Sequence, residues 1–270
     1  MTIYGPDISN NNGPNLDMAQ IKAEGFEFIF CKVSEGDYFV DRTWRRYRDS
    51  AQAAGLLVAG YHYVRADCDA ISQANVFVDN LGAGIPAMLD FEANSGGIDV
   101  FWNVVRAINE RGVEVALSYI PRWYWQQIGS PDISQVPGLI QSSYVNGSGY
   151  ASALYPGDDS PKWNGFGGAD VKILQFSDAG LVAGASVDVN AFRGTRDELV
   201  ALLNLQPAPA APTQEGPLMA LSNEEQQELL DKVRYIAGQL GPWPQLGTND
   251  QGEPLTVVDA VAKHTAGGTK

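Results

Sequence analysis

The sequence predicts an α/β fold in which eight strands close into a barrel, about five helices cover it, and a small helical appendage follows. Apolar runs of strand length alternate with helical segments five times, at roughly 25- to 30-residue spacing, which implies right-handed parallel βαβ units. Three further strands then follow without helices between them. Eight strands of which only the first five are followed by helices indicate a closed barrel rather than an open sheet.

Each predicted element rests on its local pattern. Short apolar runs bounded by turn residues predict strands at residues 3–9, 26–33, 56–63, 85–92, 113–119, 138–144, 171–177 and 185–190. Apolar residues at helical spacing, with glycines after several of the helix ends, predict helices at residues 16–24, 41–54, 69–81, 100–111, 122–128 and 196–205. Residues 145–169 show no helical period.

The fourth predicted strand carries the first candidate chemistry, because it ends in Asp90, Phe91 and Glu92. Residues two apart in a strand point to the same face, so the two carboxylates project side by side and Phe91 turns away from them. Two crowded carboxylates cannot both ionise freely, and this keeps one of them as an acid at neutral pH. The alternative is a strand that runs out into a solvated acidic loop.

Closure of the barrel makes the first and last strands neighbours, which brings Asp7 and Asp188 to the same mouth as Asp90 and Glu92. In parallel barrels the working face is formed by the C-terminal ends of the strands. Those ends also supply candidate substrate-binding residues: Lys32, Glu35, Tyr61, Tyr63, Tyr119 and Gln175. Acids and aromatics suit a sugar better than a phosphate, and the sequence has no glycine-rich phosphate loop.

Composition excludes several other classes. The formal charge of -14 argues against nucleic-acid binding, which requires a basic patch. Two cysteines and two histidines make neither a disulfide framework nor a zinc centre, so we expect no metal and no cofactor. His62 lies between tyrosines that face the other way, and it is predicted to be a hydrogen-bonded histidine of the barrel wall.

The N-terminus has neither the basic nor the apolar region of a signal peptide, and no window is long and apolar enough to insert into a membrane. We therefore expect a chain made in the cytoplasm that another factor releases if it acts outside the cell.

A Pro/Ala-rich linker at residues 206–217 separates the barrel, residues 1–205, from a tail at residues 218–270. Ser222 and Glu225 form a capping box that opens a helix. Its apolar residues recur at steps of 4, 3 and 4, at Leu229, Val233, Ile236 and Leu240. A loop carrying Trp243 and Leu246 and a second helix at residues 255–263 are expected next. So short a stripe must pack on the tail itself, on a second copy or on a partner, and the two roles expected for the tail are wall targeting and self-association through residues 222–240.

The barrel resembles the family-25 glycoside hydrolases, the lysozymes (N-acetylmuramidases) of the Chalaropsis type that are common in phage endolysins. The resemblance covers about residues 3–205 and rests on Asp7-Ile8-Ser9, Lys32-Val33-Ser34-Glu35-Gly36, Gly60-Tyr61-His62-Tyr63, Asp90-Phe91-Glu92, Leu174-Gln175-Phe176-Ser177 and Val187-Asp188-Val189-Asn190. It implies a flattened, TIM-like barrel of eight strands and five helices. The tail is similar to C-terminal segments of lysins from phages of actinobacteria, which implies such an endolysin.

The resemblance also implies an activity: cleavage of the β-1,4 bond between N-acetylmuramic acid and N-acetylglucosamine in peptidoglycan, for host lysis. Glu92 would be the general acid, and Asp90 would stay charged and orient the substrate N-acetyl group as it attacks, with net retention. Asp7 and Asp188 would hold and tune that pair. A carboxylate nucleophile or an inverting water stays open for the mechanism. A silent peptidoglycan-binding module of a phage tail or wall anchor is the alternative function.

Two departures from the family pattern concern the glycan groove. Residues 139–144 lack the tryptophan expected there, and Phe176 stands where tyrosine is usual.

Overall fold

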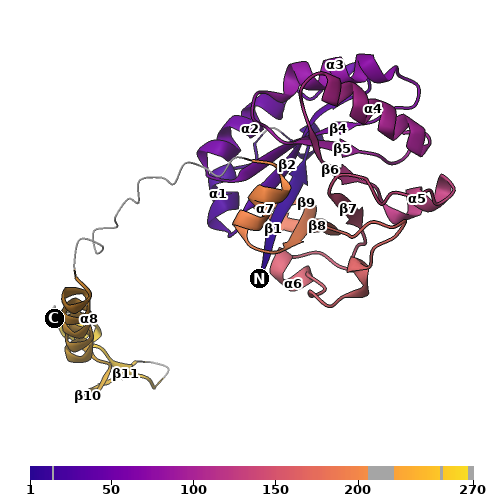
Figure 1. Ribbon diagram of the computed structural model, residues 1–270. Helices are drawn as coiled ribbons and strands as arrows, with labels where there is room; N and C mark the ends of the chain where they lie inside the picture. The colour runs from indigo at the N-terminus through magenta and orange to yellow at the C-terminus, as the bar shows by residue number, and fades with distance from the viewer. Residues whose placement is uncertain (14, 206–221, 250–251, 267–270) are drawn as a thin grey trace. The chain divides into compact units, whose positions relative to one another are not determined.

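The structure is a computed structural model that describes residues 1–13, 15–205, 222–249 and 252–266. The chain divides into two compact units, Met1–Pro207 and Ala208–Lys270 (Figure 1). The expected linker, residues 206–217, lies outside the described residues.

The first unit is a closed α/β barrel of eight strands, as predicted. The strands are β1 (Thr2–Ile8), β2 (Phe28–Glu35), β4 (Leu57–Tyr63), β5 (Ala87–Asp90), β6 (Val115–Tyr119), β7 (Leu139–Ser142), β8 (Ile173–Val182) and β9 (Ala185–Arg193). Their order is β1-β9-β8-β7-β6-β5-β4-β2, and parallel pairing of β1 with β2 closes the ring. The sequence did not predict β3 (Phe39–Val40), which pairs with the end of β2.

Strand β9 runs opposite to its neighbours. It is antiparallel to β8 on one side and to β1 on the other, whereas the other neighbouring barrel strands are parallel. Ala183 and Gly184, both with positive φ, form the two-residue turn between β8 and β9. The sequence-based expectation that strand C-termini supply the mouth is therefore wrong for Asp188, which reaches it from the first half of a reversed strand.

The predicted helices are present, with ends shifted by no more than three residues: α1 (Met18–Ala23), α2 (Trp44–Ala53), α3 (Ala70–Leu81), α4 (Ile98–Glu110), α5 (Arg122–Gln127) and α7 (Arg196–Leu202). Residues 145–169, where no helix was expected, contain α6 (Ala151–Leu154) and a 3₁₀ turn at Pro161–Trp163. Another 3₁₀ turn, Asn10–Asn12, follows β1 and is capped by the Ser9 side chain.

Two apolar clusters hold the barrel together. The inner one contains Phe28, Phe30 and Leu117, and it also includes Leu199 of α7 and Leu203, the residue directly after that helix. Because α7 follows β9, it closes the end of the barrel opposite the mouth. The outer cluster lies between the strands and helices such as α1–α4, which Figure 1 shows around the sheet. Because apolar side chains fill both clusters, the polar side chains of the barrel interior lie at its mouth.

The second unit combines helices with a small sheet. Helix α8 (Asn223–Leu240) begins with the predicted capping box of Ser222 and Glu225. The loop expected around Trp243 is instead strand β10 (Trp243–Thr248), which pairs with β11 (Pro254–Leu255), and α9 (Val257–Ala266) follows. No described helix of either unit is long and apolar enough to cross a membrane.

Candidate active site

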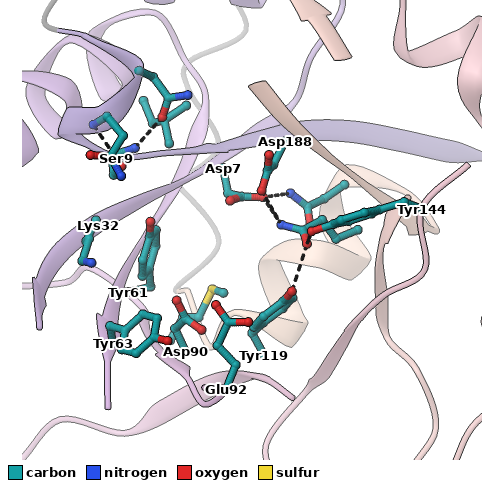
Figure 2. Close-up of a pocket in the computed structure, with 16 residues that line it drawn as sticks. Asp7, Ser9, Lys32, Tyr61, Tyr63, Asp90, Glu92, Tyr119, Tyr144 and Asp188 are labelled. Carbon is teal, nitrogen blue, oxygen red and sulfur yellow. Dashed lines mark hydrogen bonds between the residues drawn. The ribbon is translucent and has the colours of Figure 1, made fainter. Parts of the chain in front are cut away.

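The four predicted acids line one cavity of about 330 Å³ at the mouth of the barrel (Figure 2). β1 carries Asp7, β9 carries Asp188, β5 ends with Asp90, and Glu92 lies just beyond it. The cavity is also lined by Ile8, Ser9, Asn11, Asn12, Lys32, Tyr61, Tyr63, Met88, Tyr119, Tyr144, Gln175 and Asn190.

Gln175, on β8, connects two of the acids to two tyrosines. Its Nε2 donates hydrogen bonds to Oδ2 of Asp7 at 2.8 Å and to Oδ2 of Asp188 at 3.2 Å. Its Oε1 accepts hydrogen bonds from the hydroxyls of Tyr119 at 3.1 Å and Tyr144 at 2.9 Å. Two N–H donors and two lone pairs are the full capacity of a side-chain amide. Protein groups therefore occupy every hydrogen-bonding position of Gln175.

Asp7 and Asp188 share a site but differ in their partners. Oδ2 of Asp7 accepts a second amide hydrogen bond, from Nδ2 of Asn190 at 2.7 Å. Burial raises the pKa of Asp7, and the hydrogen bonds from Gln175 and Asn190 oppose that rise because they favour the ionised form. Burial, with the charge of Asp7 as the next cause, raises the pKa of Asp188 to about 8. We therefore place the negative charge of this pair on Asp7 and the proton on Asp188.

Asp90 and Glu92 crowd each other on the opposite side of the cavity. Burial, followed by the charge of Glu92, raises the pKa of Asp90 well above its usual value. Burial, followed by the charge of Asp7, raises the pKa of Glu92, and Lys32 lowers the pKa of both. Burial therefore favours the protonated form of Asp90 in the ligand-free site, and the expectation that Asp90 stays charged remains a prediction. Oδ1 of Asp90 is buried without a hydrogen-bond partner among the described residues.

A tight turn fixes Glu92. Its backbone N–H donates to Oγ of Ser95 at 3.1 Å, and the Ser95 hydroxyl donates to the carbonyl of Val64 at 2.7 Å. Phe91 is fully buried and packs edge-to-face against Phe101. Phe91 thus points away from the cavity, as the alternation of a strand predicts, and this directs Asp90 and Glu92 to the same side.

Lys32 and two predicted tyrosines form the wall beside Asp90. Nζ of Lys32 lies 5.1 Å from the centre of the Tyr63 ring and 2.6 Å from Oε2 of Glu35. The Tyr63 hydroxyl donates to the carbonyl of Ala93 at 2.7 Å, so Tyr63 presents its ring to the cavity. Burial and the charges of Asp7 and Asp90 raise the pKa of the buried Tyr61 hydroxyl well above its usual value.

Glu35, predicted to bind substrate, is outside the cavity lining. Its carboxylate pairs with Lys32 and with Nη1 of Arg65 at 3.6 Å, and it accepts a hydrogen bond from Tyr38 at 3.3 Å. Glu35 thus forms an ion pair that holds Lys32 and does not face the cavity. His62 is also outside the lining: it is buried, with Nδ1 2.9 Å from Oγ of Ser34, as predicted for a wall histidine.

Sequence reasoning missed several lining residues, among them Tyr144, Asn190, Asn11 and Asn12. A signal existed for Asn190, because it lies two residues after Asp188 and so faces the same side of β9. The two asparagines belong to the turn after β1, and their polar character alone did not distinguish them from any other turn. Tyr144 follows β7 and meets the cavity through a loop whose path the sequence does not reveal.

Comparison with known proteins places this site in a family. The sequence profile described as glycosyl hydrolases family 25 matches residues 6–185, which include three of the four acids, Asp7, Asp90 and Glu92. The chain belongs to that family. This glycosyl hydrolases family 25 member is therefore a glycoside hydrolase.

Curated relatives of this glycoside hydrolase include two named lysozymes. It is 28% identical over 209 residues to the autolytic lysozyme of Clostridium acetobutylicum, covering 73% of this chain and 63% of that protein. It is 26% identical over 227 residues to lysozyme M1 of Streptomyces globisporus, covering 75% of this chain and 71% of that protein. Solved structures share the fold: a bacterial lysozyme from Streptomyces coelicolor aligns with a TM-score of 0.62 and 22% identity, over 75% of this chain and 97% of that chain.

The tail has relatives of its own. A profile described as the Rv3766 C-terminal domain matches residues 221–267. The protein Rv3766 of Mycobacterium tuberculosis is 32% identical over 273 residues, covering 88% of each chain. The similarity to Rv3766 thus extends through the barrel and the tail together.

Proposed function

We propose that this glycoside hydrolase is a muramidase that cleaves the β-1,4 bond between N-acetylmuramic acid and N-acetylglucosamine in peptidoglycan. Membership of family 25 and the lysozyme names of two relatives support the substrate class. The four-acid cavity supports acid-assisted glycoside cleavage, because burial raises the pKa of each carboxyl group in it, and the charges of neighbouring acids add to the rise at Asp90, Glu92 and Asp188.

Glu92 is the proposed general acid. It lines the cavity beside Asp90, its side chain is partly exposed to the incoming glycan, and its pKa is raised. A carboxyl group with a raised pKa keeps its proton near neutral pH and can give it to the glycosidic oxygen as the bond breaks. Asp7 contributes to this by raising the pKa of Glu92 through its charge.

The buried, unpartnered Oδ1 of Asp90 is the observation that carries the mechanism. An N-acetyl N–H of the substrate is a donor that would satisfy this oxygen. A hydrogen bond to the carboxylate favours its ionised form, so substrate binding moves the proton shared by the pair from Asp90 to Glu92. The ionised Asp90 then orients the N-acetyl group and stabilises the positive charge as its carbonyl oxygen attacks the anomeric carbon, which gives net retention.

The bond that is cut and the anomer that is released test this proposal. The purified chain is incubated with insoluble peptidoglycan, new reducing ends are labelled, and the fragments are identified by mass spectrometry. We expect N-acetylmuramic acid at the new reducing ends, and proton NMR of a chitin-like or muropeptide oligomer should show the β anomer first. Reducing N-acetylglucosamine would contradict the bond assignment. Binding to the wall without new reducing ends would instead favour the silent peptidoglycan-binding module.

Around this activity we propose a lytic role: a protein made in the cytoplasm of a bacterial host of an actinobacterial phage, released to the wall by another factor. A virion-associated enzyme is the alternative. Similarity of the tail to a mycobacterial protein supports an actinobacterial setting. Detection of the chain in purified phage particles by mass spectrometry would favour the virion-associated form, whereas its presence only in infected cells would favour the endolysin.

For the tail we propose an intermolecular contact, either with the wall or with a second copy of the chain. The seam residues of α8, Leu229, Val233, Ile236 and Leu240, are exposed in the tail unit. The exposed fraction of these side chains is 40–56%. Apolar side chains on one helix stripe are stabilised when another surface covers them.

A further inference from the structure

The neighbouring acids determine which way the side-chain amide of Gln175 is oriented, with its nitrogen toward the acids and its oxygen toward the tyrosines. The ionised carboxylate of Asp7 only accepts hydrogen bonds, so Nε2 of Gln175 faces Asp7, and it faces the neighbouring Asp188 with it. Its Oε1 must then face the other way, toward Tyr119 and Tyr144. An amide oxygen only accepts hydrogen bonds, so each of these hydroxyls donates its single hydrogen to Oε1 of Gln175.

The consequence reaches the cavity surface, because Tyr119 and Tyr144 line it. A phenol whose hydrogen is committed can offer only its oxygen lone pairs to a ligand. Tyr144 lines the cavity and is 42% exposed, whereas Gln175 is 5% exposed. The Tyr119 hydroxyl and Asp7, both labelled in Figure 2, are therefore bonded to the same side-chain amide.

We infer that Gln175 is a positioning residue, not a substrate ligand, and that it makes Tyr119 and Tyr144 act as hydrogen-bond acceptors toward the glycan. The wall of the cavity is thereby selective for donor groups of the substrate, such as hydroxyl and N-acetyl N–H groups. The same amide donates a hydrogen bond to Asp7. This hydrogen bond favours the ionised form of Asp7, whose charge acts on Glu92. This inference rests on the proposed function for its substrate, but the hydrogen-bond order concerns this chain alone.

Two substitutions change the amide in different ways. Gln175→Met removes both donors and the acceptor while filling a similar volume. Gln175→Glu keeps an acceptor for the tyrosines but places a third carboxyl group against Asp7 and Asp188. The matched control is Gln141→Met, since Gln141 is another buried glutamine, 3% exposed, on the neighbouring strand and outside the cavity lining.

The first measurement is the pH profile of kcat/KM on soluble peptidoglycan fragments. Without its donor from Gln175, Asp7 is protonated at a higher pH and no longer raises the pKa of Glu92. We therefore expect Gln175→Met to lower kcat/KM about tenfold and to move the basic limb about one pH unit lower. Gln141→Met should keep the wild-type profile. Equal profiles for Gln175→Met and Gln141→Met would overturn the inference.

The second measurement tests whether Gln175 acts through Tyr144. In a double-mutant cycle, Gln175→Met should cost at least threefold less in the Tyr144→Phe background than in the wild type, since the hydroxyl it orders is already gone. Additive losses would contradict this route and assign Gln175 to a separate role.

A readout without activity keeps the two proposals apart. Carboxyl ¹³C NMR titration follows Asp7 directly, and Asp7 should titrate at higher pH in Gln175→Met than in Gln141→Met, because the hydrogen bond from Gln175 lowers its pKa. If the wild type releases no reducing ends, the muramidase proposal fails while this titration still decides the role of Gln175. If the titration of Asp7 is unchanged by Gln175→Met in a folded protein, the positioning role is excluded.

Discussion

Asp7 and Asp188 are direct partners across the antiparallel pair of β1 and β9, and their Oδ2 atoms share the amide of Gln175. One comes from the first strand of the chain and the other from the last barrel strand. Closure of the barrel therefore creates this contact, and it creates an electrostatic cost, because two carboxyl groups are held together in a partly buried place.

Asp188→Asn should stabilise the protein at neutral pH. The pKa of Asp188 is raised to about 8 in the folded state from its ordinary value of 3.8, so its ionisation opposes folding as the pH rises between those values. Asparagine removes that cost and can still accept from Gln175. We expect a gain of about 1 kcal/mol at pH 7, after discount for solvent screening. The gain, measured by urea unfolding, should vanish below about pH 4; a gain that persists at acid pH would contradict the electrostatic origin.

Glu92→Gln should abolish catalysis without unfolding the barrel. An amide cannot donate the proton that the leaving oxygen requires, so the release of reducing ends should fall at least 100-fold. The melting temperature should stay equal or rise, because one of the crowded carboxyl groups is gone. Glu114→Gln, an exposed position before β6, is the matched control and should retain full activity. Retained activity in Glu92→Gln would sink the general-acid assignment.

Asp90→Asn should reveal whether Asp90 acts through the N-acetyl group. On intact peptidoglycan the variant is expected to lose about 100-fold or more in kcat/KM. On de-N-acetylated glycan the wild type should already be slow, and the variant should lose little further, because the group that Asp90 orients is absent. Equal losses on both substrates, measured in parallel, would point instead to a carboxylate nucleophile or a general base.

His62 should make the protein sensitive to acid. Burial lowers the pKa of His62 from 6.5 to about 4, so the unfolded chain binds a proton in this window that the folded chain does not. Stability due to the neutral ring is present above about pH 6.5 and is lost as the pH falls toward 4. His62→Gln should flatten the pH dependence of the melting temperature in that window relative to the wild type. His264→Gln, at an exposed position of the tail, should leave it unchanged.

If the tail self-associates, the exposed apolar residues of α8 should form the contact between two copies of the chain. Val233→Asp and Ile236→Asp place charges on the seam and should lower the molar mass measured by light scattering. Gly238→Asp, on the opposite face with open space around it, is the control and should not. If the seam variants keep their molar mass but no longer sediment with cell walls, wall targeting is the role of the tail.

Local sequence patterns determined most of the elements and the acid pair. Alternation alone placed Asp90 and Glu92 on one side and Phe91 on the other, because side-chain direction in a strand follows the backbone. Counting strands brought Asp7 and Asp188 together, since closure makes the ends of a sheet neighbours. Apolar residues at helical spacing, with glycines after several helices, predicted the helix ends to within three residues. The hairpin β10–β11 was missed, because its strands are short and contain Pro and Gly.

Tertiary structure alone decided the roles within the site. No local sequence pattern shows that β9 runs opposite to its neighbours or that Glu35 pairs with Lys32 instead of facing the cavity. The sequence also does not show that the Gln175 amide is hydrogen-bonded to four protein groups. The sequence also suggested that Asp90 stays charged, whereas its burial in the folded barrel favours the proton. Residue type and spacing specify which groups meet, but desolvation and hydrogen-bond direction depend on every element packed around them, and these set the protonation of each acid.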